Sequence, residues 1–135
     1  MAQPIVISRI PDYSDLDLDF IPHPTTKDVV VKTGEDAIKR SVRNLILTNF
    51  YEKPFRPGIG SSAVKLLFDN MTPLVSNFLE NAIREVIQNY EPRVEVIKVT
   101  VVPDYDNNGY TAKIEFIVLN RNQPLITTIF LERVR

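Results

Sequence analysis

The residues that most resemble a metal-ligand set lie between two segments that alternate as strands do. Asp104, Asp106, Asn108, Gly109 and Glu115 have the spacing of an EF-hand calcium loop. That loop requires a helix on each side, and neither flank here has helical periodicity. The Asn-Asn-Gly run is also common hairpin-turn chemistry. We therefore expect a hairpin here and no metal site, and a calcium-binding module is kept as an alternative function.

Carboxylates could also supply the acid and base of a cell-wall hydrolase, and the candidates are Glu80, Glu85, Glu91 and Glu95. Glu80 and Glu85 lie off the apolar face of a predicted helix, so we expect both to be solvated charges. His23 is the single histidine, so a multi-histidine metal site is excluded. With neither a nucleophile motif nor a phosphate-binding loop, we predict that the chain is not an enzyme and holds no cofactor.

The sequence Glu91-Pro92-Arg93 combines a carboxylate, a helix breaker and a cation at the end of a long predicted helix. Pro92 disfavours helical geometry at Glu91, so the helix should end there. A carboxylate at the negative end of a helix dipole is unfavourable unless a cation lies nearby. Two explanations stay open from the residues alone: an internal ion pair between Glu91 and Arg93, or a charge that meets a partner protein.

The helix that positions this motif is predicted within Leu74 to Arg93, ending on Glu91-Pro92-Arg93, and apolar residues recur along it at helical period. They are Leu74, Val75, Phe78, Leu79, Ala82, Ile83, Val86, Ile87 and Tyr90. Thr72 can cap the free N–H groups of the first turn, and Pro73 suits the first helical position because it lacks an N–H. We expect this helix to be the centre of the core.

Two other helices are expected before it. A capping-box-like start at Thr33 to Asp36 introduces a helix that should end near Thr48, and a short helix is predicted over Ala63 to Phe68. Between them, two prolines and two glycines forbid regular structure, so residues 49–62 should form a structured loop. Its expected apolar anchors are Phe50, Tyr51, Phe55 and Ile59.

The N-terminal part reads as an extended arm. Short strands are possible at Ile5–Ile7 and Val29–Val31. Between them, aspartates alternate with large apolar residues at period two, which places carboxylates and apolar side chains on opposite sides. The aspartates are Asp15, Asp17 and Asp19, and the apolar residues are Leu16, Leu18 and Phe20. We expect the apolar side to lie on a hydrophobic surface and the carboxylates to face water.

After Arg93 the period changes from 3.6 to two, which predicts a meander of antiparallel strands at Val94–Val102, Tyr110–Leu119 and Leu125–Val134. The expected fold class is α+β, with three helices packed on one face of a small, mainly antiparallel C-terminal sheet that has an open edge strand. We expect a single domain over 1–135, made of an arm (1–32), a helical part (33–93) and a β-meander (94–135).

The amino-acid composition narrows the range of possible functions. The chain has 135 residues, a formal net charge of −1 and no cysteine. It therefore lacks the basic field expected of a nucleic-acid or membrane-surface binder, and disulfides and zinc–thiolate sites are excluded. No apolar run approaches the roughly 20 residues that span a bilayer. We expect a soluble protein made in a cytosol.

Three segments resemble the baseplate wedge and sheath-initiator family of contractile phage tails. They are FIPHPTTKDVVV, AIKRSVRNLILTNFYEKPFRPGIGSSAVKLLFDNMTPL and NYEPRVEVIKVTVVP. The resemblance spans about Tyr13 to Val134, looks closest to the T-even-like branch, and extends to type VI secretion baseplates. One departure is Tyr51, where family members commonly carry glycine. Members have also been called lysozyme-like, so a cell-wall-degrading hydrolase is kept as an alternative.

The resemblance implies a structural subunit of the virion tail baseplate, assembled in the host bacterial cytoplasm. Its implied partners are the tail sheath protein, other wedge subunits and central tube or hub proteins. Glu91, Pro92 and Arg93 would help hold the helical core bundle of the wedge. Sheath would begin by strand pairing along the last strand, for which the candidate residues are Leu125, Thr127, Ile129 and Leu131.

Overall fold

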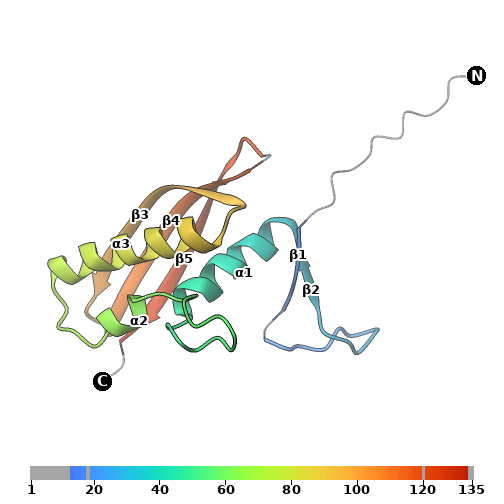
Figure 1. Cartoon of the computed structure of the whole chain (residues 1–135), viewed down its shortest axis with the longest axis horizontal. Coiled ribbons are helices and arrows are strands. Elements are labelled where there is room, and N and C mark those ends of the chain that lie inside the picture. The colour runs from blue at the N-terminus through green and yellow to red at the C-terminus, as the bar shows by residue number, and fades with distance from the viewer. Residues whose placement is uncertain (1–12, 18, 120, 134–135) are drawn as a thin grey trace, which may run out of the picture. The chain divides into compact units, whose positions relative to one another are not determined.

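A computed structural model describes residues 13–17, 19–119 and 121–133 (Figure 1). Its elements are β1 (Ser14–Leu16), β2 (Val31–Thr33), α1 (Gly34–Leu47), α2 (Ala63–Leu66), α3 (Pro73–Tyr90), β3 (Val94–Asp104), β4 (Gly109–Val118) and β5 (Pro124–Glu132). Strands β3, β4 and β5 form a three-stranded antiparallel sheet in that order, and β1 pairs with β2. The α+β class is confirmed.

Contacts divide the chain into two compact units, residues 1–40 and residues 41–135. The single-domain expectation therefore stays a prediction. The expected strand at Ile5–Ile7 lies outside the described residues.

The core of the larger unit lies between α3 and the sheet, and α3 contacts β3 directly (Figure 1). Six residues of the predicted apolar face are buried: Val75, Leu79, Ala82, Ile83, Val86 and Ile87. Leu74 and Phe78 are instead 61% and 49% exposed, so the apolar face is wider than the sheet covers. The start of α3 is as predicted, because the Thr72 side chain accepts a hydrogen bond from the Val75 N–H at 3.3 Å.

The alternation of β4 was predicted correctly. Tyr110, Ala112, Ile114, Phe116 and Val118 are all buried on one face of the sheet. The opposite face is not purely polar, because β5 adds Ile126 and Phe130 there, 51% and 44% exposed.

The hairpin expected at residues 104–109 is present, because Asp104 and Gly109 close the β3–β4 ladder. Asp104 accepts hydrogen bonds from the backbone and side chain of Asn107, at 3.1 and 2.8 Å, and so stabilises the turn. Throughout the described ranges, no cluster of three metal-ligating side chains occurs.

The arm differs from its predicted form. Asp15 and Asp19 are exposed as expected, but Asp17 is 3% exposed, and Leu16 and Phe20 are 57% and 67% exposed where burial was expected. The cause is electrostatic: Asp17 lies 3.3 Å from the Arg40 guanidinium and 3.6 Å from the Lys32 ammonium, and a buried charge needs such partners. Phe20 also has a φ of 51°, so the extended conformation ends there. Leu18 lies outside the described residues.

Two of the four expected loop anchors are wrong. Phe50 and Ile59 are partly buried, but Tyr51 and Phe55 are 82% and 102% exposed. Both have positive φ, 66° and 64°, a backbone geometry that bulky side chains rarely adopt. Among described helices, none is long and apolar enough to cross a membrane.

Candidate functional site

The end of α3 carries the first candidate site. Glu91 caps the helix with its N–H donating to the Ile87 carbonyl at 2.9 Å, and its side chain is 3% exposed. Arg93 forms a bidentate ion pair with this carboxylate: its Nε donates to Oε1 at 2.6 Å and its Nη2 donates to Oε2 at 2.8 Å. The Ser41 hydroxyl also donates a hydrogen bond to Oε2. The internal ion pair is therefore present. Pro92 is exposed and Arg93 partly so, which leaves part of the motif accessible.

The electrostatics of this helix end follow from those contacts. Burial raises the pKa of Glu91, but the hydrogen bonds from Arg93 and Ser41, with the charge of Arg93, outweigh it and hold the pKa of Glu91 below its usual value. Glu91 is therefore a carboxylate at neutral pH. A glycosidase acid needs the opposite, a raised pKa, so Glu91 is unsuited to that role.

The outer strand β5 carries the second candidate site. The side chains of Ile129 and Leu131 are buried on the core face, and those of Leu125 and Thr127 are partly buried. All four lie opposite buried residues of β4. These four predicted residues therefore serve the core through their side chains.

The direction of those backbone groups follows from the ladder. The Arg133 N–H donates to the Asn108 carbonyl at 3.1 Å, one position beyond the Gly109–Glu132 pair. Hydrogen-bonded and non-bonded pairs alternate in antiparallel sheets, so the odd-numbered residues of β5 bond to β4. Even-numbered residues direct their N–H and C=O groups outward. The outward set is Ile126, Thr128, Phe130 and Glu132, and no described residue hydrogen-bonds to it.

The opposite edge of the sheet is obstructed in part. By the same alternation, the backbone groups of β3 that face outward are those of Val94, Val96, Val99, Val101 and Pro103, and three of these five positions are blocked. The Val94 N–H donates to the Glu91 carbonyl at 3.3 Å, the Val101 N–H donates to Glu80 Oε1 at 2.9 Å, and Pro103 has no N–H. A register irregularity between Val96 and Lys98 further distorts this edge. Glu80, expected to be a solvated charge, in fact occupies the edge of β3.

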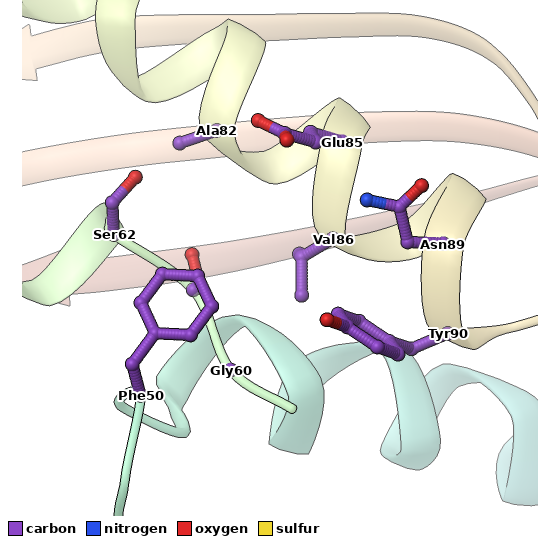
Figure 2. A pocket seen from close by; sticks show the side chains of 9 residues that line it. Phe50, Gly60, Ser62, Ala82, Glu85, Val86, Asn89 and Tyr90 are labelled. Atoms are coloured by element: carbon purple, nitrogen blue, oxygen red, sulfur yellow. The ribbon is translucent and has the colours of Figure 1, made fainter. Parts of the chain in front are cut away.

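A hollow of about 150 Å³ lies between the 49–62 loop and α3, lined by side chains that include Phe50, Glu85 and Tyr90 (Figure 2). Sequence reasoning did not find it, because its walls come from segments at least 20 residues apart. Glu85 is its single carboxylate, so it lacks the pair that glycoside hydrolysis uses. It is also smaller than the roughly 300 Å³ typical of ligand pockets.

Comparison with known proteins places these features in a family. The family model for baseplate wedge protein gp25 matches residues 32–123. The chain is 36% identical over 108 residues to baseplate wedge protein gp25 of Enterobacteria phage T4, covering 80% of this chain and 81% of that protein.

Solved structures share the fold. A candidate tail lysozyme from Geobacter sulfurreducens matches with a TM-score of 0.66 and 25% identity, over 76% of this chain and 96% of that one. A chain of the anti-feeding prophage baseplate matches with a TM-score of 0.62 and 20% identity, over 92% of this chain and 88% of that one. Since the family model covers well over half of the sequence, the chain belongs to the baseplate wedge protein gp25 family.

Proposed function

We propose that this chain is a structural subunit of a contractile-tail baseplate wedge in the virion, and that tail sheath assembly begins on it. A segment of the sheath protein pairs as a new strand along the outer edge of β5. The observation that carries this proposal is the difference between the two edges of the sheet. Part of the β3 edge is obstructed, by Glu80 at Val101 and by Pro103, whereas none of the outward groups of β5 has a partner among the described residues.

The side chains beside the open edge favour an extended partner. Ile126 and Phe130 are about half exposed on the outer sheet face. Both belong to the even-numbered residues of β5, whose backbone groups face outward. An added strand would pair with that backbone and cover these apolar side chains, so hydrogen bonding and apolar burial would act together. The relevant positions are therefore Ile126, Thr128 and Phe130.

The helix end has a different role in the proposal. Glu91 and Arg93 hold each other, so their charges are already satisfied within the chain. Neighbouring wedge subunits would pack on the exposed Pro92 and on the accessible part of the Arg93 guanidinium. The Glu91-Pro92-Arg93 motif would then be a rigid corner whose shape is fixed before assembly. The tube or hub proteins would be further neighbours of the subunit.

Sheath growth on baseplates that lack this protein tests the proposal directly. Electron microscopy should show sheath only when the purified chain is added back. The Thr128→Pro variant should restore sheath poorly when it is added, because the substitution removes an outward-facing N–H group. The matched control Thr111→Val lies on the same sheet face but on the central strand, and it should restore sheath. Normal sheath without the protein would contradict the proposal.

The hydrolase alternative has a separate test. The chain is similar to a candidate tail lysozyme, but the pKa of Glu91 is lowered and Glu80 is engaged by Val101. We therefore expect no release of soluble fragments from purified cell walls by the chain. Turnover that Glu85→Gln or Glu91→Gln abolished in a folded protein would overturn the structural function.

A further inference from the structure

The loop over residues 49–58 presents two aromatic rings that the chain itself does not use. Tyr51 and Phe55 are 82% and 102% exposed. Both have φ near +65°, a conformation that is unfavourable for bulky side chains. Strain of this kind persists only where the surrounding structure imposes it, and it is concentrated at functional positions. These rings gain no burial that would offset the strain.

The loop is held firmly at its base. The Ser61 N–H donates to the Thr48 carbonyl at 2.8 Å, and the Tyr90 hydroxyl donates to the Gly58 carbonyl. Gly60 packs so closely that a Cβ there would lie 2.6 Å from the Asn49 carbonyl carbon. These contacts fix both ends of the loop.

The tip of the loop is closed by its own bonds. The Tyr51 N–H donates to the Pro57 carbonyl at 2.9 Å, and the Asn49 N–H donates to Glu52 at 2.8 Å. Pro54 and Pro57 restrict the backbone further. The rings are thus displayed on a rigid turn, so little conformational entropy would be lost when a partner covers them.

The charges on the turn indicate the partner's chemistry. Lys53 and Arg56 are exposed beside the rings, and Glu52, the one acidic residue of the turn, is engaged by the Asn49 N–H. Two cations are too few for nucleic acid or an anionic membrane, which draw on larger basic clusters. Aromatic rings with arginine are typical of protein–protein hot spots.

We propose that this turn, with Tyr51, Lys53, Phe55 and Arg56, docks onto a neighbouring baseplate protein whose surface has an apolar socket rimmed by acidic side chains. This interface is distinct from the β5 edge, which would pair with sheath. It rests on the proposed function, because the partner is taken to be another baseplate subunit. Tyr90 connects the turn to the end of α3, so the partner would lie beside the Glu91-Pro92-Arg93 corner.

The experiment measures incorporation of the purified full chain into isolated baseplates that lack it, by quantifying the bound chain after sedimentation. The double variant Tyr51→Ala/Phe55→Ala should lose at least tenfold in apparent affinity while its melting temperature does not fall. Tyr105→Ala is the matched control, because Tyr105 is 66% exposed on another turn. It should incorporate normally. Lys53→Glu/Arg56→Glu should also weaken incorporation, and added salt should weaken that of the natural chain.

The outcomes separate the two proposals. Incorporation of the natural chain and of the aromatic double variant with equal affinity overturns the docking turn and leaves the wedge function intact. Failure of the natural chain to incorporate overturns both. Phosphatidylserine vesicles and duplex DNA serve as competing probes, and binding of the natural chain to either that the double variant loses would overturn the choice of a protein partner. Self-association lost in the double variant would assign the turn to a second copy instead.

Discussion

Glu80 should protect the β3 edge and stabilise the sheet at the same time. Its carboxylate accepts the Val101 N–H at 2.9 Å, and Val101 is 5% exposed. Glu80→Ala leaves that buried N–H without an acceptor. A hydrogen bond to a charged group is worth about 1.5–3 kcal/mol, and the loss should approach that range because little water reaches the site. At about 4 °C per kcal/mol, the melting temperature should fall by roughly 6–12 °C.

Two measurements on the full chain check this reasoning. Urea unfolding gives the change in the free energy of unfolding, and amide hydrogen exchange reports on the Val101 N–H itself. Glu80→Gln keeps an acceptor oxygen at the same reach and should lose less than half as much stability. Glu85→Ala, on an exposed part of the same helix, should change stability by no more than about 0.5 kcal/mol. Faster exchange at Val101 is expected only in the Ala variant. Unchanged stability and unchanged Val101 exchange in Glu80→Ala would refute the edge-protection argument.

Three other predictions concern stability. Because the folded pKa of Glu91 is lowered, its contribution is present above the unfolded pKa of about 4.3 and is lost as pH falls through the folded pKa. Glu91→Gln should therefore cost on the order of 2 kcal/mol at pH 7 and flatten the decline of stability on acidification, measured by urea unfolding across pH 2–7. Gly60→Ala should cost at least 1–3 kcal/mol in the same assay, because its methyl group would overlap the Asn49 backbone. Thr72→Ala should lower stability by about 1 kcal/mol, whereas Thr72→Ser should be nearly neutral, as thermal melts can show.

Local rules predicted much of this fold from the sequence. The cap of α3 at Thr72, its end at Glu91 and the turn at Asn107 depend on neighbours within four residues, so sequence spacing is sufficient to find them. The alternation of β4 predicted its buried face for the same reason.

Long-range electrostatics and backbone strain explain what the sequence could not predict. Asp17 is buried because Arg40, 23 residues away, is its partner, and Glu80 reaches Val101 across 21 residues. Neither pairing has a signal in local periodicity. At Tyr51 and Phe55 the apolar side chains suggested burial, but both residues are exposed and have positive φ angles, which local periodicity does not reveal. The helix-end motif could be found from residue chemistry. Which residues of β5 direct their backbone groups outward could be determined only from the observed register between β4 and β5.

The difference between the two edges of the sheet bears on how many added strands one subunit can bind. A sheet with two open edges can add strands on both sides and so propagate into a filament, as edge-to-edge aggregates do. Here part of the β3 edge is obstructed, so we expect an extended segment to bind along β5 and binding to saturate at one segment per chain. Two isolated copies could at most join as a closed pair. If strands add along β5 as proposed, the subunit would accept a strand on one side only, which would give strand addition a single direction.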